Sequence, residues 1–262
     1  MKKKYKMKKL GGSLFIRNAI TLDYHVQETV ECLKELCDEV VICDAGSTDG
    51  TDNLVESFQD KKTKVILCTP EMWEEQKTQK KLSYFTNIAI NALNSEWNFC
   101  LQGDEVAHES SFPYIWEAVN RNYGDAYFCK RINLWGNSQY RLSVPENRLP
   151  VGEDIIRLAK SDHMAVEDAQ SLDGPASFEF LDKIRIYHTG FVRDKNKHMK
   201  KIENMMCNVF GWGLDEKLKS MGDEFDPWKH FSKEDVKPIE EELPKYIQKW
   251  AKETDVKNGI II

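Results

Sequence analysis

The chain has 262 residues, of which 41% are hydrophobic and 31% charged, and its net charge is −6. This composition excludes a wholly disordered chain, and the excess of acid argues against a general nucleic-acid binder. The sequence holds no run of 18 apolar residues, which argues against a transmembrane segment.

The first ten residues contain six lysines, and we interpret residues 1–10 as a basic, solvated N-terminal tail. A weak attraction to anionic membrane surfaces is the alternative. The apolar stretch from Gly12 to Ile16 is too short for the core of a signal peptide. None of the seven cysteines forms a CxxC pair, which indicates free thiols in a reducing compartment. We therefore expect a cytoplasmic protein.

Strand-like and helix-like segments alternate through the first hundred residues. Short apolar runs predict buried strands, and apolar side chains at helical spacing predict amphipathic helices. In chain order we predict a strand at 12–16, a helix over 22–36, a strand at 39–43, a helix from residue 51, a strand at 64–68, a helix over 80–94 and a strand at 97–101. This alternation predicts an α/β fold in which helices flank a mostly parallel, Rossmann-like sheet.

The pattern is looser beyond residue 110. We predict strands at 125–135, 155–158 and 183–187, and helices at 195–210 and 240–252. The stretch 136–177 is rich in Pro, Asn, Asp and Gly, which favours long loops. Residues 196–262 are therefore expected to form a helical C-terminal extension.

Three polar segments follow predicted strands: Arg17-Asn18, Asp44 to Asp49 and Gln102 to Glu105. In parallel sheets, ligands bind beyond the carboxyl ends of the strands. The Asp44 carboxylate could accept a hydrogen bond from the N–H of a uracil or guanine ring. The alternative is a plain strand-to-helix turn in which Thr51 caps the helix.

The segment Gln102-Gly-Asp-Glu105 brings two adjacent carboxylates to the end of a strand. Such a pair is costly unless a cation or a hydrogen-bond donor compensates it, and oxygen ligands suit Mg²⁺ or Mn²⁺. His188, in the strand-like Tyr187 to Arg193, could complete the coordination of a metal. The alternatives are a solvated acidic turn and a histidine with a structural role.

These segments resemble family 2 glycosyltransferases of the GT-A fold. The resemblance rests on Leu14 to Asn18, Asp44-Ala-Gly-Ser-Thr-Asp-Gly-Thr51, Gln102 to Glu105 and Tyr187 to Arg193, and it covers roughly residues 12–195. It implies a GT-A domain at 11–195, with a nucleotide-binding half at about 11–110 and an acceptor half at about 111–195. It also implies that a sugar moves from a UDP- or GDP-sugar to a glycan or other hydroxyl-bearing acceptor, with Mn²⁺ or Mg²⁺ as cofactor and, as in most of the family, with inversion.

The resemblance also implies roles for individual residues. The metal ligands would be Asp104 and His188, and the general base would be Asp168, chosen over Glu153, Asp154 and Glu167. The nucleotide-binding residues would be Phe15, Arg17, Asn18, Asp44, Ser47, Lys81, Gln102 and Gly103. Lys80 is the alternative to Lys81 as a partner of the donor phosphates.

The sequence departs from the family pattern at two positions. Gln102 stands where the family's Asp-x-Asp motif has its first aspartate, and Ala45 stands where many members have a second aspartate. Gln102 can still hydrogen-bond a ribose hydroxyl, so nucleotide binding survives more easily than tight metal binding. A non-catalytic nucleotide- or glycan-binding protein is therefore the alternative function. A sugar-phosphate nucleotidyltransferase is disfavoured, because residues 15–19 lack a glycine-rich phosphate loop.

Overall fold

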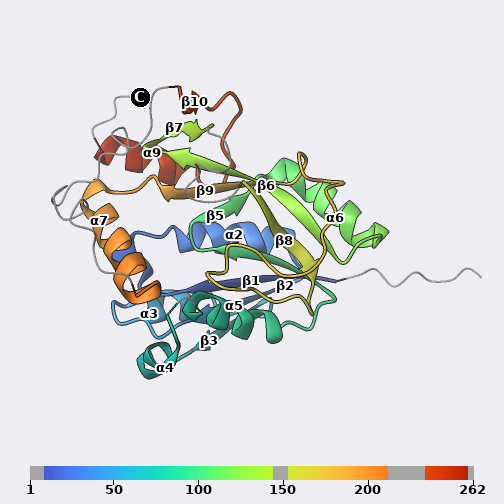
Figure 1. Cartoon of the computed structure of the whole chain (residues 1–262), viewed down its shortest axis with the longest axis horizontal. Coiled ribbons are helices and arrows are strands. Elements are labelled where there is room, and N and C mark those ends of the chain that lie inside the picture. Colours follow the sequence, from blue (N-terminus) through green and yellow to red (C-terminus); the bar gives the residue numbers. More distant parts are fainter. Residues whose placement is uncertain (1–8, 79, 144–152, 212–233, 259–262) are drawn as a thin grey trace, which may run out of the picture.

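The computed structural model of the chain describes residues 9–78, 80–143, 153–211 and 234–258 (Figure 1). The strands are β1 (Leu10–Ile16), β2 (Glu39–Asp44), β3 (Thr63–Leu67), β4 (Trp97–Gln102), β5 (Glu105–Ala107), β6 (Ala126–Trp135), β7 (Asn137–Leu142), β8 (Asp154–Lys160), β9 (Arg185–Phe191) and β10 (Val236–Pro238). The α-helices are α1 (Ala19–Leu22), α2 (Val26–Leu36), α3 (Thr51–Glu56), α4 (Pro70–Glu75), α5 (Lys81–Asn91), α6 (Phe112–Arg121), α7 (Lys195–Glu203) and α9 (Gln248–Lys257). A 3₁₀ turn at Glu109–Ser111 precedes α6, and a π-helical segment at Asn204–Val209 continues α7.

The strands form one sheet in the order β10-β7-β6-β8-β4-β1-β2-β3, with β9 paired to β5 and β6. The pairs β1–β2, β2–β3 and β1–β4 are parallel, which confirms the predicted parallel sheet in this half. Their register places Phe15 opposite Gln102 and Ile16 opposite Asp44, so the three predicted polar segments begin at one edge of the sheet. Beyond β4 the pairs are antiparallel, except for β6–β9.

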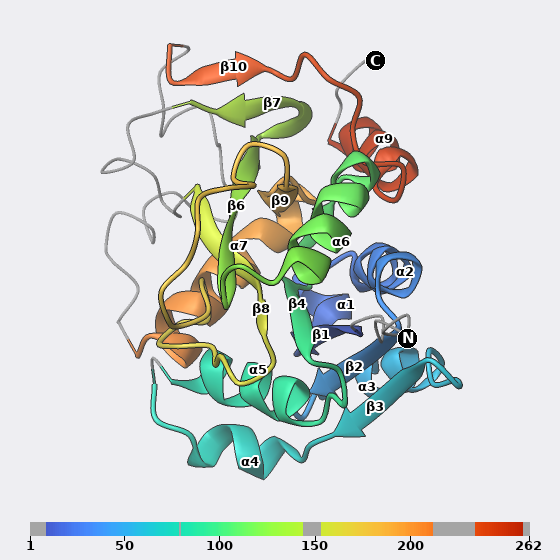
Figure 2. The ribbon, with the colours of Figure 1, turned by 90° about the vertical axis from the view of Figure 1, so that its right-hand side faces the viewer.

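Two layers of helices cover the two faces of the sheet, as Figure 2 shows. One hydrophobic core packs α2 and α6 against the sheet, and Ile247, just before α9, belongs to it. The other core packs α4 and α5 against the opposite face, with Trp73, Phe85 and Val209 among its buried side chains. Alternate residues of β2 enter the two cores, because successive side chains of a strand point to opposite faces.

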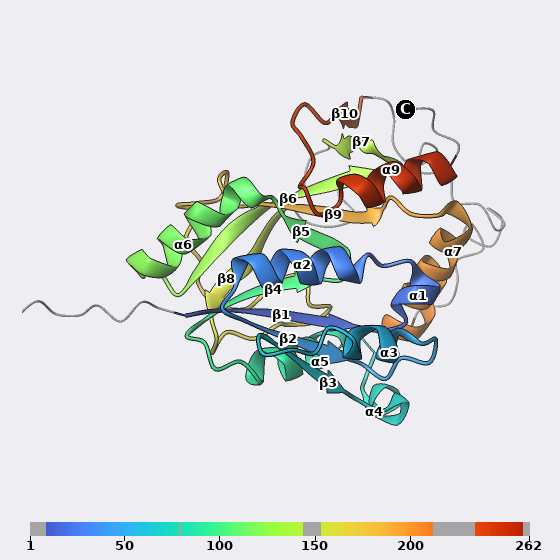
Figure 3. The same ribbon diagram turned by 180° about the vertical axis from the view of Figure 1, so that it is seen from behind.

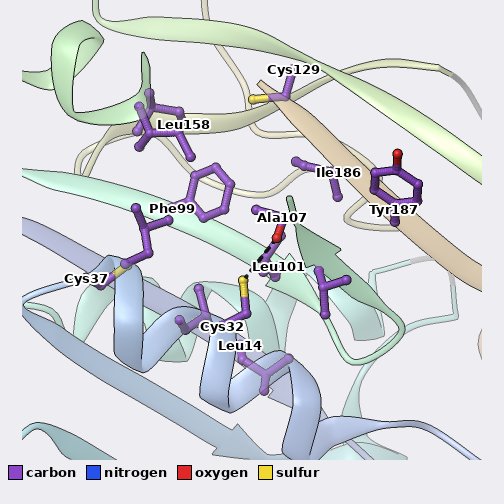
Figure 4. Packing of buried hydrophobic residues seen from close by; sticks show 14 of the residues in the cluster. Leu14, Cys32, Cys37, Phe99, Leu101, Ala107, Cys129, Leu158, Ile186 and Tyr187 are labelled. Carbon is purple, nitrogen blue, oxygen red and sulfur yellow. Dashed lines mark hydrogen bonds between the residues drawn. The ribbon is translucent and has the colours of Figure 1, made fainter. Parts of the chain in front are cut away.

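The cysteines are free thiols, as expected from the sequence, and six of the seven are buried or half-buried. In the first core, Cys32 Sγ donates a weak hydrogen bond to the carbonyl oxygen of Ala107 at 3.6 Å (Figure 4). Cys32 here behaves as a small buried hydrophobe. Within the described residues, no helix has both the length and the apolar character needed to cross a bilayer.

The second half of the chain is more regular than predicted. The stretch expected to form long loops contains β7, which pairs with β6 and β10. The C-terminal extension is not purely helical, because β10 adds a strand to the central sheet. Its last helix begins at Gln248, after Pro244, rather than near residue 240. Most of the basic N-terminal tail lies outside the described residues, and the domain boundaries stay predictions.

Candidate functional site

A cavity of about 270 Å³ opens at the carboxyl ends of β1 and β4. Helix α7 stands at this end of the sheet, close to α1 (Figure 3). Seven of the residues singled out from the sequence line the cavity, namely Phe15, Arg17, Gln102, Gly103, Asp104, Asp168 and His188. The lining described for the cavity does not include the other four, Asn18, Asp44, Ser47 and Lys81.

Asn18, Asp44 and Ser47 bond to one another beside the cavity. Asp44 is buried, and its two carboxylate oxygens accept hydrogen bonds from the Ser47 amide at 2.8 Å and the Ser47 hydroxyl at 2.5 Å. Burial raises the pKa of Asp44 despite these bonds. The backbone N–H of Asn18 donates to Ser47 Oγ at 2.9 Å, which joins the turn after β1 to the turn after β2. This network holds the two turns together, and a contact of Asp44 with a nucleotide base stays a prediction.

Arg17 and Lys81 lie around the indole ring of Trp73. The Arg17 guanidinium carbon is 4.4 Å from the ring centroid, and Lys81 Nζ is 5.1 Å from it. Arg17 Nη1 also donates to the Ala45 carbonyl at 3.3 Å, and Lys81 Nζ is 3.8 Å from a carboxylate oxygen of Glu74. Trp73 lines the cavity beside Arg17. It was not predicted as a site residue, because the sequence around a tryptophan in a short helix does not indicate which distant residues it contacts.

Asp104 is the most heavily engaged carboxylate of the cavity. Its Oδ2 lies 2.7 Å from Lys201 Nζ, 3.4 Å from Arg193 Nη2 and 3.6 Å from His188 Nε2. Burial alone would raise the pKa of Asp104, but Lys201, His188 and Arg193 together hold that pKa well below its usual value. Burial in turn lowers the pKa of Lys201 to about 8. The predicted proximity of Asp104 and His188 is thus observed. The same cluster contains Arg193, which belongs to the predicted segment of His188, and Lys201, which no motif indicated.

His188 is held by its other ring nitrogen. Nδ1 lies 2.9 Å from Oδ1 of Asn133 on β6, and Nε2 faces Asp104 Oδ2, so the tautomer of the neutral ring decides which of these two contacts receives its N–H. Burial lowers the pKa of His188, which favours this neutral form. Gly190 makes room for the ring, because a Cβ there would lie 2.4 Å from His188 Nε2.

The residues around Asp104 do not fit a divalent cation. No group of three His, Cys, Asp or Glu side chains able to hold a metal occurs among residues that the structure describes. Asp104 and His188 would be two ligands, and the oxygen of Asp104 that faces His188 already bonds to Lys201. Mg²⁺ is usually held by one or two carboxylates together with substrate phosphates, whereas the carboxylate of Asp104 is surrounded by the positive charges of Lys201 and Arg193. The expected metal stays a prediction without support from this geometry.

Glu105 differs from its neighbour Asp104 in direction and partners. Its carboxylate is fully buried and accepts hydrogen bonds from Arg157 Nε and Nη2, each at 2.9 Å, and from Arg131 Nη1 at 3.3 Å. The acidic turn is therefore not a pair of carboxylates that share one ligand. Each acid is compensated separately by protein cations.

The two arginines and Gln102 also fix the loop that carries Asp168. Arg157 Nη1 and Gln102 Nε2 both donate to the Ala169 carbonyl, at 3.1 and 3.2 Å, and Arg131 Nη2 donates to Gln170 Oε1 at 2.9 Å. This finding gives Gln102 a contact that an aspartate could not make, because a carboxylate has no N–H group to donate. Asp168 itself is half-buried and lines the cavity. Among the described residues, its carboxylate has no ion-pair partner.

Comparison with known proteins assigns the family. The model of glycosyl transferase family 2 matches residues 25–169, which is more than half of the chain. The chain therefore belongs to glycosyl transferase family 2. No curated protein matches it.

Among solved structures, the chain is similar to S. aureus TarS. One TarS structure has 13% sequence identity and a TM-score of 0.47, with 80% of this chain and 41% of the TarS chain covered. A second, TarS 1-349 in complex with UDP, has 15% identity and a TM-score of 0.46, with 80% and 68% covered. A third, TarS 1-349 in complex with UDP-GlcNAc, has 15% identity and a TM-score of 0.44, with 80% and 69% covered. The chain thus spans less than half of the first of these chains.

Proposed function

We propose that the protein transfers a sugar from a UDP- or GDP-sugar to a hydroxyl group of an acceptor, with inversion at the anomeric carbon. The observation that carries the proposal is one cavity, in a family 2 glycosyltransferase, lined by both the acidic turn after β4 and the carboxylate of Asp168. Phe15, Arg17, Gln102 and Gly103 form the wall near the strand ends, where we place the nucleotide.

In this proposal Asp168 acts as the general base. Its carboxylate takes the proton of the acceptor hydroxyl while the hydroxyl oxygen forms a bond to the anomeric carbon. The bond from that carbon to the phosphate oxygen breaks on the opposite face, and its electron pair leaves with the nucleoside diphosphate. Donors that face the leaving group stabilise its growing negative charge, which is where electrostatic catalysis contributes most.

The test is release of nucleoside diphosphate by the full chain from a panel of UDP- and GDP-sugars, with candidate hydroxyl acceptors present and absent. We expect release from at least one donor, accelerated by an acceptor. Absence of both turnover and nucleotide binding across the panel would contradict the proposal.

A non-catalytic nucleotide-binding protein is the second candidate. One observation favours it, namely that Gln102 replaces a family carboxylate and bonds to the Ala169 carbonyl rather than remaining free. Binding of UDP or GDP without any turnover of the corresponding sugars would support this alternative. The cytoplasmic location and the membrane contact of the N-terminal lysines remain expectations from the sequence.

A further inference from the structure

Lys201 is a cation of the cavity wall that neither the motif nor the family match assigns. It lies on α7, its side chain is 14% exposed, and its Nζ donates to Asp104 Oδ2 at 2.7 Å and to the Gly190 carbonyl at 3.3 Å. A lysine ammonium has three N–H groups. Two are used by these acceptors, and the described residues supply no third, so one N–H group can bind a ligand in the cavity.

The neighbouring arginine cannot replace it. Arg193 donates to the carbonyl oxygens of Leu22 and Gly190 as well as to Asp104, and it is not among the residues described as lining the cavity. Its guanidinium therefore contributes positive charge behind Asp104, whereas Lys201 carries positive charge to the cavity surface.

The backbone makes room for this lysine. A Cβ on Gly190 would lie 3.0 Å from Lys201 Nζ, in addition to its clash with the His188 ring. The ring of Tyr24 lies on another side, with its centroid 5.2 Å from Lys201 Nζ and 5.1 Å from the Arg193 guanidinium carbon. Lys201 is thus enclosed by a carboxylate, a carbonyl oxygen and an aromatic face. These contacts fix the position of its ammonium group, whereas a lysine on an open surface has no such contacts.

The charges at this point favour an anion. Around the one carboxylate of Asp104 stand the cations of Lys201 and Arg193, and the next carboxylate, Glu105, is compensated by its own two arginines. A divalent cation at Asp104 would add two positive charges beside a carboxylate that Lys201 and Arg193 already balance. A diphosphate would instead find a positive site with an N–H donor.

Resting on the proposed function, we infer that Lys201 binds the diphosphate of the donor in place of a metal ion, so that nucleotide binding needs no divalent cation. In this role the ammonium stabilises the leaving diphosphate, and Asp104 holds the ammonium in position.

Titration calorimetry on the full chain tests this inference with UDP and GDP as probes, each in excess EDTA and in excess Mn²⁺. The wild type is expected to bind its preferred nucleotide with dissociation constants that agree within about twofold in the two buffers. Lys201→Met should weaken that binding by about tenfold or more, and should leave the affinity for the matching nucleoside, which has no phosphates, unchanged.

Lys200→Met is the matched control, because Lys200 is exposed on the same helix. The affinity of this variant for the nucleotide should equal that of the wild type. A thermal melt verifies that each variant is folded, and the wild-type comparison in EDTA and Mn²⁺ needs no variant. Binding that disappears in EDTA and returns with Mn²⁺ would overturn the inference while supporting the proposed function. Wild-type affinity in a folded Lys201→Met would also overturn it. Failure of both nucleotides to bind the wild type in either buffer would instead contradict the proposed function itself, and the inference with it.

Discussion

Asp168 lies between two residues with left-handed backbone conformations. Glu167 has φ of 48° and Ala169 has φ of 58°, values that non-glycine residues adopt at a cost. The hydrogen bonds from Gln102 and Arg157 to the Ala169 carbonyl compensate for this strain. The loop is therefore held in one conformation, which directs the carboxylate of Asp168 into the cavity.

Replacement of this carboxylate tests its role. Asp168→Asn should reduce kcat for sugar transfer by about a hundredfold or more, because an amide cannot accept the acceptor's proton, while KM for the donor changes little. Glu167→Gln is the control, since Glu167 is exposed and adjacent, and it should retain wild-type kcat. Steady-state kinetics measure both parameters. Equal kcat values in the two variants would contradict the role of Asp168 as general base.

At the residue scale, the sequence predicted those side chains that belong to strand ends. Asp104 and His188 follow from motifs on neighbouring strands, and the structure brings them within 3.6 Å. Lys201 could not be predicted in this way, because α7 carries several lysines that are equivalent in sequence. Only the packing of α7 near α1 distinguishes the lysine that reaches Asp104.

The turn between β2 and α3 depends on two glycines with different surroundings. Gly46 has φ of 73°, and a Cβ there would lie 2.5 Å from the Thr69 carbonyl oxygen and 2.6 Å from the Pro70 nitrogen. Gly50 has φ of 91°, but among the described residues a Cβ there would meet only Ile20 Cδ1, at 3.6 Å. Both positions disfavour a side chain by conformation, and Gly46 disfavours it by contact with backbone as well.

Alanine substitutions should separate these two effects. We expect Gly50→Ala to lower the free energy of unfolding by about 1 kcal/mol, through left-handed strain alone. Gly46→Ala should lower it by about 2–4 kcal/mol, because the backbone of residues 69 and 70 must also move. Urea denaturation of the two variants measures the difference. Equal losses of unfolding free energy in the two variants would contradict the additional cost expected from the backbone contact at Gly46.

At the element scale, prediction succeeded where apolar periodicity was strong and failed where elements are short. The predicted strand at 39–43 corresponds to β2, Glu39–Asp44. Helix α4 was missed because it has only six residues, and Pro70 occupies its first turn. Strand β7 was missed because its sequence, NSQYRL, is mostly polar, although it forms a hairpin with the preceding strand β6.

His25 connects distant parts of the whole molecule. Its Nε2 lies 2.5 Å from Thr189 Oγ1 on β9, and its ring centroid is 4.7 Å from that of Trp250 on α9. Burial lowers the pKa of His25 from 6.5 to about 4, so the folded protein holds the neutral ring. The N-terminal half, the strand of His188 and the last helix therefore meet at a side chain that resists protonation.

This depressed pKa predicts how stability depends on pH. Below pH 6.5 His25 takes up a proton in the unfolded chain but stays neutral in the folded chain. The free energy of unfolding therefore falls as the pH decreases towards 4, by up to about 3 kcal/mol. Above pH 7 the same group contributes no pH dependence. His25→Gln should remove this contribution, which urea denaturation at a series of pH values would measure. Parallel pH profiles for the variant and the wild type would contradict the assignment.

At the scale of the whole molecule, the sequence predicted a parallel sheet with polar strand ends, and the family match supports that interpretation. It did not predict the antiparallel half, because β8 pairs with β4 and β10 pairs with β7 across long sequence separations, and the sequence of β7 is mostly polar. It also did not predict that α7 closes one side of the cavity with Lys201, since that contact depends on tertiary packing.

A crystal structure of the full chain with UDP or GDP bound would test the central claim most directly. We predict that the nucleoside lies along Phe15, Arg17 and Gln102, with a phosphate oxygen within hydrogen-bonding distance of Lys201 Nζ. A nucleotide that binds outside this cavity, or a diphosphate far from α7, would contradict the account.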